Sequence, residues 1–175
     1  MMSILNRRRH DPLWRWDRAK ECDEWPDTNP GDNEGTSVRA AMDVLRTVGH
    51  VCVFRGKGKR PSLTEGILEN RWATIVDEVR TVLTGGVPVV LGIKWYTNFG
   101  APVRKQINWW VGDGDLGTIR GGHAMCVTRA SDELQAVGFV NNWGKRYPRM
   151  VHIPYPVLGR LLREDGEATM VTDRP

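Results

Sequence analysis

The feature that most constrains this 175-residue chain is a pair of neighbouring apolar segments, each bounded by a chemically informative residue. His123 opens a strand predicted over residues 124–128, and Asn141 closes a strand predicted over residues 136–141. Residues 131–133, Ser-Asp-Glu, have the composition of a turn. Because antiparallel strands joined by a short turn lie side by side, we expect His123 and Asn141 at the same end of a sheet.

This placement has a chemical consequence. The side-chain oxygen of Asn141 can accept the ring N–H of His123, which fixes the tautomer and leaves the other ring nitrogen to act as a base. We expect the two groups within hydrogen-bond reach, at about 2.6–3.2 Å. Trp143, two residues further on, can cover the pair and keep water away from it. Singly, each residue is typical of an ordinary turn or core, but their joint spacing indicates a site.

The remaining elements predict an α+β layout, with helices first and strands later. Helices are predicted over residues 13–24, 36–48 and 68–83, with a short helix or turn over 154–162. Strands are predicted over residues 51–54, 87–95, 150–153 and 168–172, and a loop that contains Trp109 and Trp110 follows the second of these. In the 36–48 helix, Ser37 or Thr36 is the cap, Gly49 ends it, and Val38, Ala41, Met42 and Leu45 form the buried face.

The stretch GGHAM, a strand, and then FVNNWG resembles the papain-like cysteine peptidases, bacterial and phage members more than plant or animal ones. The resemblance extends over about residues 24–172 and implies a papain-like fold, a helical part followed by an antiparallel β subdomain. It implies His123 as general base and Asn141 as its orienting partner; Asn142 stands where the family has serine. It also implies contacts to an extended peptide substrate from Gly35, Gly122 and Trp143.

The nucleophile of that family has no clear counterpart among Cys22, Cys52 and Cys126. The family's cysteine opens a long helix roughly 130–150 residues before the histidine, an offset from His123 that falls before Met1. Cys22 is followed by Asp-Glu-Trp-Pro, which cannot form such a helix, and it remains only a candidate nucleophile. Cys52 lies in a predicted strand, and Cys126 lies three residues after His123, on the opposite face of its strand. The resemblance therefore implies a domain truncated at its N-terminus.

Domain organisation and partners follow from charge and composition. We expect a basic arm over residues 1–12 and one papain-like domain over 13–175, mainly helical to residue 83 and mainly β from residue 84. The net charge of +4 comes partly from basic runs at residues 7–10 and 55–60, which lack interleaved aromatics and indicate solvated surface rather than nucleic-acid binding. The cysteine spacing argues against a disulfide framework and a zinc site, and no cofactor is expected.

No apolar run reaches the length of a membrane span, and the N-terminal sequence lacks the order of a signal peptide, so a cytoplasmic location is expected, or a virion if the gene belongs to a phage. Three hypotheses for function remain open. The first is a peptidase homologue that does not cleave and binds a peptide or protein. The second is an active peptidase whose nucleophile is Cys22 or comes from another, upstream-encoded chain. The third is a phage virion or assembly protein that contacts other virion subunits and uses the fold as a scaffold.

Overall fold

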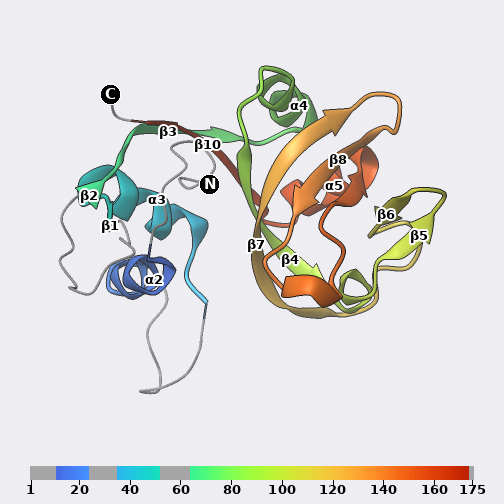
Figure 1. The fold of residues 1–175 in the computed structure, drawn as a ribbon, viewed down its shortest axis with the longest axis horizontal. Helices are drawn as coiled ribbons and strands as arrows, with labels where there is room; N and C mark the ends of the chain where they lie inside the picture. The colour runs from blue at the N-terminus through green and yellow to red at the C-terminus, as the bar shows by residue number, and fades with distance from the viewer. Residues whose placement is uncertain (1–10, 24–34, 52–63, 174–175) are drawn as a thin grey trace. The chain divides into compact units, whose positions relative to one another are not determined.

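The computed structural model describes residues 11–23, 35–51 and 64–173 (Figure 1). The chain forms two compact units. The first comprises Met1–Arg71 with Val171–Pro175, and the second comprises Trp72–Met170. The expected basic arm, residues 1–12, lies outside the described residues except at its end, where Asp11 and Pro12 begin a helix.

The first unit begins with helix α2 (Pro12–Lys20). The carboxylate of Asp11 caps it by accepting the backbone N–H groups of Leu13 and Trp14 at 3.0 and 3.2 Å. The helix predicted over residues 13–24 ends at Lys20, and residue 24 lies outside the described residues. Glu21 and Asp23 would have placed acidic side chains at the negative end of the helix dipole, which disfavours extension.

Helix α3 (Val38–Thr47) confirms the strongest helix prediction. The hydroxyl of Ser37 accepts the N–H of Ala40 at 3.1 Å, and Gly49, at φ +97°, ends the helix by donating its N–H to Val44. Among the predicted face residues, Val38, Met42 and Leu45 are buried, whereas Ala41 is only partly buried. Ala19 of α2 packs against Ala40 and Val44 of α3, which joins the two helices.

A two-stranded antiparallel ladder follows these helices in the first unit. It pairs β1 (His50–Val51) with β2 (Thr64–Glu65). The strand predicted over residues 51–54 overlaps β1 only at Val51. Residues 52–63, with Cys52 and the second basic run, lie outside the described residues.

The helix predicted over residues 68–83 is wrong in its first half. The chain instead forms strand β3 (Ile67–Ala73) and then helix α4 (Val76–Thr84). β3 is a neighbour of β10 in the sheet, and backbone pairing of this kind overrides weak local helix propensity. The carboxylate of Glu78 then sets the start of α4 by accepting the N–H groups of Thr74 and Ile75. Because α4 contacts β4 and β7, it belongs to the second unit, although the expected helical part extended to residue 83.

The main sheet has the order β3-β10-β4-β7-β8-β9-β6-β5. Its strands beyond β3 are β4 (Val89–Tyr96), β5 (Val103–Lys105), β6 (Asn108–Trp110), β7 (Ile119–Ser131), β8 (Ala136–Val140), β9 (Val151–Pro154) and β10 (Glu167–Asp173). From β10 to β5 the pairs are antiparallel, except that β6 runs parallel to β9. In the second unit the sheet curls around helix α5 (Tyr155–Arg163) (Figure 1).

Trp109 and Trp110 lie in strand β6, not in the loop predicted from the sequence. The Asn, Gly and Pro content of this stretch is typical of a loop, but the stretch forms a hairpin in which Val103 pairs with Trp110 and Lys105 with Asn108. Gln106 adopts a φ of +54° in the turn between them.

The core of the second unit is one continuous cluster inside the curl. Its fully buried members include Phe99, Val89, Leu91, Val127, Val137, Phe139, Ile153 and Leu158. Phe99 comes from the 3₁₀ helix η1 (Thr97–Gly100), and the others come from the inward face of β4, β7, β8 and β9 and from α5. No helix within the described ranges is long and apolar enough to span a membrane.

Candidate functional site

Strand register brings His123 and Asn141 to one face of the sheet. His123 is paired with Ile93 across β4 and β7, and Val127 is paired with Phe139 across β7 and β8. Because side chains alternate along a strand, His123 and Asn141 extend the same face that carries Val127 and Phe139 into the core. Both therefore lie at the rim of the core, where the curled sheet opens.

The predicted hydrogen bond between these residues is confirmed. The Nε2 atom of His123 lies 2.9 Å from the Oδ1 atom of Asn141. An amide oxygen can only accept, so Nε2 carries the proton and Nδ1 of the neutral ring has a free lone pair. The N–H of Asn142 also donates to this oxygen at 2.8 Å. Two donors therefore converge on one acceptor and fix both the amide and the imidazole.

An aromatic cluster surrounds the imidazole. The Trp95 ring lies edge-on to it at a centroid distance of 4.7 Å, and the Trp143 ring lies at 4.8 Å. Trp143 is 44% exposed, so it shields the His123–Asn141 pair on one side and presents its other side to solvent. The expected cover by Trp143 is therefore present. Trp95 was not predicted as a site residue, although it lies near the end of the apolar strand β4, where it pairs with Gly121 of β7.

Burial lowers the pKa of His123, and the hydrogen bond from its ring to Asn141 opposes that effect. The neutral imidazole is thereby favoured near neutral pH. A neutral ring with an unprotonated Nδ1 is the form that a general base requires.

Tyr147 is a second residue that the sequence reasoning missed. Its hydroxyl donates to the backbone oxygen of Phe99 at 3.0 Å, and burial raises its pKa, an effect that a contact from the Asn141 amide partly offsets. The Nδ2 atom of Asn141 is buried, and no acceptor lies in good hydrogen-bond geometry around it. Tyr147 therefore borders the site through the ring of Trp143 and is anchored by its hydrogen bond to Phe99. The sequence feature that could have indicated Tyr147 is its position four residues after Trp143. The centroids of the two rings lie 5.2 Å apart.

The described cysteines lack the setting of an activated thiol. Cys22 follows the C-terminal end of α2, where its sulfur lies 3.4 Å from the Arg18 carbonyl oxygen and donates to it. Its pKa is raised by partial burial and by the carboxylates of Asp43, Asp23 and Glu21. Cys126 is three positions from His123 in β7, so its side chain lies on the opposite face, and burial raises its pKa.

The two glycines expected to contact substrate occupy different units. Gly35 is exposed in the first unit, two residues before the cap of α3, and its carbonyl oxygen accepts the Lys20 ammonium at 3.5 Å. Gly122 is exposed in β7 beside His123, and a side chain at this position would meet no atom within 4 Å. The backbone next to the imidazole is therefore open to a partner.

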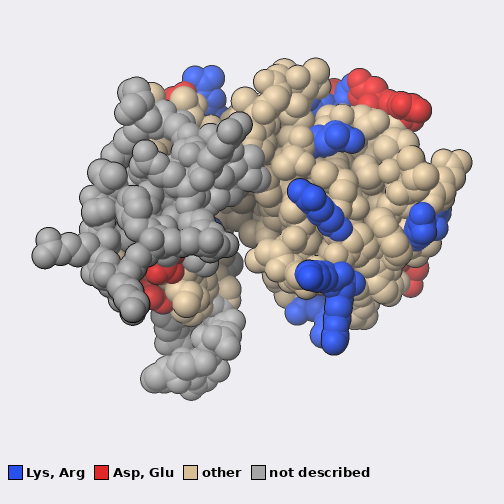
Figure 2. Space-filling model, viewed as in Figure 1, with Lys and Arg blue, Asp and Glu red and all other residues tan. Residues whose placement is uncertain are grey.

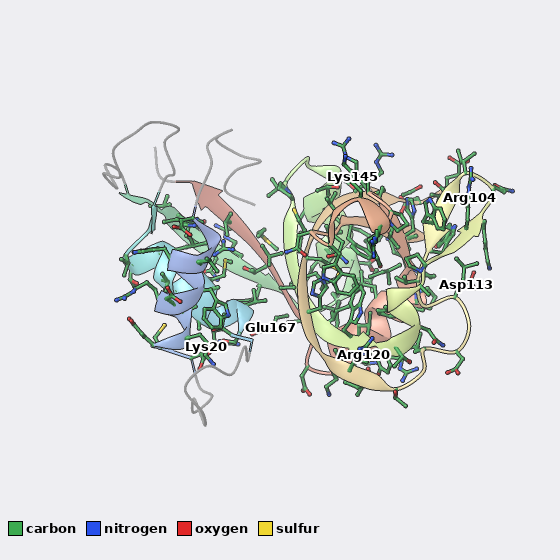
Figure 3. All side chains as sticks on the ribbon, turned by 60° about the horizontal axis from the view of Figure 1, so that its bottom comes forward. Lys20, Arg104, Asp113, Arg120, Lys145 and Glu167 are labelled. Carbon is green, nitrogen blue, oxygen red and sulfur yellow. The ribbon has the colours of Figure 1, made fainter. Side chains whose placement is uncertain are left out.

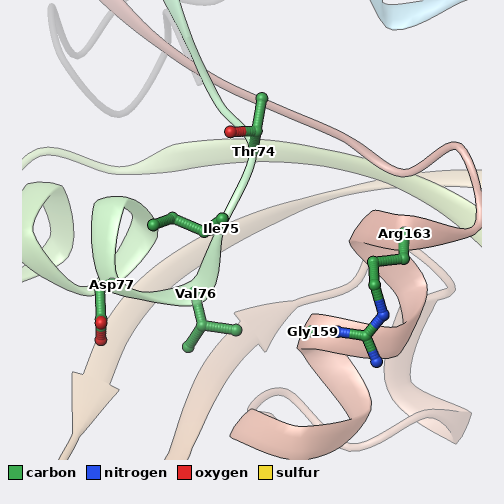
Figure 4. A pocket seen from close by; sticks show the side chains of 6 residues that line it. All are labelled: Thr74, Ile75, Val76, Asp77, Gly159 and Arg163. Carbon is green, nitrogen blue, oxygen red and sulfur yellow. The ribbon is translucent and has the colours of Figure 1, made fainter.

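A cavity of about 320 Å³ lies between the start of α4 and α5 (Figure 4). Its lining consists of Thr74, Ile75, Val76, Asp77, Gly159 and Arg163, none of which was predicted as a site residue. The described part of the chain contains no cluster of three or more metal-ligating side chains. The His123 rim therefore remains the best candidate site.

Neither a protein-family profile nor a curated relative matches the sequence. Among solved structures, the fold is similar to that of xylellain, a cysteine protease from Xylella fastidiosa, with a TM-score of 0.61 and 18% sequence identity. The similarity covers 81% of this chain but only 63% of xylellain, so the chain matches less than two thirds of that protein. With the α+β architecture described above, this similarity shows that the chain has the papain-like fold.

Proposed function

We propose that this chain is a papain-like peptidase homologue that binds an extended peptide or a protein partner and does not hydrolyse peptides by itself. The observation that carries the proposal is an assembled His123–Asn141 pair, 2.9 Å apart, with neither of the described cysteines on the same face of its sheet. The base and its orienting group are present in the second unit, but the described part of that unit has no thiol positioned to use them.

The chemical requirements of a cysteine nucleophile support the proposed lack of peptide hydrolysis. A cysteine acts as nucleophile as the thiolate, which a neighbouring imidazolium or a helix N-terminus stabilises by lowering the thiol pKa. Cys22 and Cys126 both have raised pKa values, for reasons of burial and, at Cys22, of nearby carboxylates. Cys22 also lies at the C-terminal end of a helix, where the dipole disfavours a thiolate.

The backbone of β7 supports peptide binding. β4 pairs with β7 as far as Ile119, whereas β8 pairs with it only from Cys126 to Ser131. Residues 119–124 thus have a backbone edge that no described strand covers, and Gly121 and Gly122 keep it free of side chains. An extended peptide can add to such an edge through main-chain hydrogen bonds. It would then lie beside His123 and the exposed ring of Trp143.

Labelling by an active-site-directed electrophile tests the proposal. A peptidyl vinyl sulfone is incubated with the purified wild-type chain and with His123→Ala and Cys22→Ser, and the modified positions are mapped by mass spectrometry. We expect no stoichiometric, His123-dependent modification and no hydrolysis of fluorogenic peptides. Peptide binding is measured in parallel by fluorescence anisotropy.

Each of the other outcomes supports a different function for this chain. Rapid labelling of Cys22 that disappears in His123→Ala would establish an active peptidase with Cys22 as nucleophile. Hydrolysis that appears only when a second, upstream-encoded chain is added would establish an enzyme whose nucleophile comes from another polypeptide. Absence of both labelling and peptide binding would overturn the proposed function.

A further inference from the structure

The cations of the second unit divide into two groups, those with an ion-pair partner and those without. The described ion pairs of this unit are Arg80 with Asp77 and Asp132, Lys94 with Asp165, Lys105 with Asp113, and Arg160 with Glu164. Four of these five carboxylates come from α4 or from turns that flank α5 and the β7–β8 connection, away from the connection between β8 and β9.

The connection between β8 and β9 carries three exposed cations, Lys145, Arg146 and Arg149. None of them forms an ion pair with any residue in the described ranges, and the connection contains no carboxylate. In Figure 2, Lys and Arg side chains gather over the 3₁₀ helix η2 (Gly144–Arg146) and the neighbouring front of β7, while Asp and Glu lie at the edges of that face. The connection leads directly from Asn141 and therefore flanks the candidate site.

A further exposed cation without a described ion-pair partner, Arg120, lies on β7 three positions before His123. Figure 3 shows Lys145 at the top and Arg120 at the bottom of the second unit in that view, so the two cations lie well apart. Arg120 adds positive charge to the start of β7, whereas Lys145, Arg146 and Arg149 form the cationic group of the β8–β9 connection.

Trp143 adds an apolar surface to the same connection. It is the residue before η2, and Gly144, at φ +73°, turns the chain so that Lys145 and Arg146 follow at once. The indole is 44% exposed while its other side contacts His123 and Tyr147. A partner that covers the free side of this ring would also lie close to the cationic residues Lys145 and Arg146, which follow Trp143 by two and three positions.

We infer that the peptide segment bound at the His123 rim is acidic, with an apolar side chain for Trp143 and carboxylates for Lys145 and Arg146. This inference rests on the proposed function and adds the chemical class of the partner to it. Like charges held together without counter-charges create a positive potential, which attracts and orients a complementary anionic partner.

A peptide fits this surface better than a single-stranded nucleic acid. Nucleic-acid grooves combine a cationic track with several aromatic side chains on which successive bases stack. The β8–β9 connection offers one exposed tryptophan, and the neighbouring β7 edge offers backbone donors and acceptors, which suit a peptide main chain.

The test is an affinity selection on the full chain from a displayed library of random decapeptides, followed by sequencing. We expect enrichment of Asp and Glu next to an aromatic or aliphatic residue. The double variant Lys145→Glu with Arg146→Glu should lose that enrichment and bind the best selected peptide roughly tenfold more weakly, since each exposed pair contributes modestly. The matched control is Arg104→Glu with Arg163→Glu, which makes the same charge change at two exposed cations outside the connection and outside β7 and should retain the wild-type affinity.

Salt and competitor provide the decisive readouts. Raising sodium chloride from about 50 to about 300 mM should weaken the wild-type complex severalfold and the double variant far less, because exposed charge pairs are screened. If no peptide is enriched, the proposed function itself fails. Enriched peptides without acidic residues, or equal losses in the double variant and its control, would overturn the inference while leaving peptide binding intact. A ten-nucleotide oligothymidine that binds more tightly than the selected peptide would overturn it in favour of nucleic acid.

Discussion

At the scale of single residues, the Oδ1 atom of Asn141 holds the site together because it accepts both the His123 ring and the Asn142 amide. These two hydrogen bonds determine the tautomer of His123, and burial under Trp143 then lowers the pKa of the ring. The lowered pKa of this imidazole therefore favours the neutral form that a base requires and also makes the stability of the protein depend on pH.

The lowered pKa of His123 predicts a specific dependence of stability on pH. The unfolded chain takes up a proton on this ring near pH 6.5, whereas the folded chain does so only at lower pH. The stabilisation is therefore complete above about pH 7 and is lost as the pH falls through 6.5 toward the folded-state pKa. Because the glutamine in His123→Gln does not titrate but can still donate to Asn141, the variant should lose less free energy of unfolding between about pH 7.5 and pH 5.

Urea unfolding at several pH values measures this difference. The comparison is between wild type and His123→Gln, so that the titration of carboxylates and other histidines cancels. Parallel pH profiles for the two proteins would show that the ring titrates normally and that its burial is not as described.

The hydrogen bond of the Tyr147 hydroxyl predicts that its removal lowers the stability of the protein. In Tyr147→Phe the buried oxygen of Phe99 loses its donor, so the free energy of unfolding should fall by about 1–3 kcal/mol. The matched control is Tyr155→Phe, whose hydroxyl donates to the exposed carboxylate of Asp132 and whose loss should cost less than about 1 kcal/mol. Equal losses in thermal or urea unfolding would contradict the support that Tyr147 gives to the site.

At the scale of elements, helix α3 shows how local signals and burial agree. Ser37 and Gly49 mark its two ends, and Met42, 3% exposed, lies at the centre of its buried face. An aspartate at that position would place an unpaired charge in an apolar environment.

Met42→Asp should therefore destabilise the protein by about 3–5 kcal/mol, whereas Thr47→Asp, an exposed position on the same helix, should cost less than about 1 kcal/mol. Circular dichroism during urea unfolding compares the two variants with wild type. A wild-type midpoint for Met42→Asp would mean that this face of α3 is not buried.

At the scale of the whole molecule, the chemical groups of the family pattern are distributed over separate elements. His123 and Asn141 belong to the second unit, Cys22 follows a helix of the first unit, and Cys126 lies on the outward face of β7. The proposed lack of peptidase activity rests on the outward position of Cys126 and on the raised pKa values of the two described thiols, Cys22 and Cys126.

The reactivity of the thiols with iodoacetamide checks this distribution. Alkylation requires the thiolate, so Cys22 should react more slowly at pH 7 than a free cysteine peptide, and its rate should keep rising above the ordinary thiol pKa. Cys126 should react more slowly still because it is partly buried. Rates are followed for each cysteine by mass spectrometry in wild type and in His123→Ala, which should be identical. A fast, pH-independent rate at Cys22 near pH 6–7 that is lost in His123→Ala would contradict the prediction.

The sequence by itself determined α3, most strands of the second unit, the papain-like fold class and the His123–Asn141 contact. The helix, the strands and the contact rest on short-range signals, namely caps, apolar alternation and the spacing of two residues across one turn, whereas the papain-like fold class rests on the resemblance of GGHAM and FVNNWG to a known family. Only the tertiary structure decided that residues 67–73 form β3, that Trp109 and Trp110 pair in a hairpin, and that Tyr147 and Trp95 complete the site. These features depend on partners far away along the chain, such as the Phe99 oxygen for Tyr147 and the strand β10 for β3. Pairing over such separations leaves no periodic pattern in the local sequence, because it is the backbone and the neighbouring packing that select it.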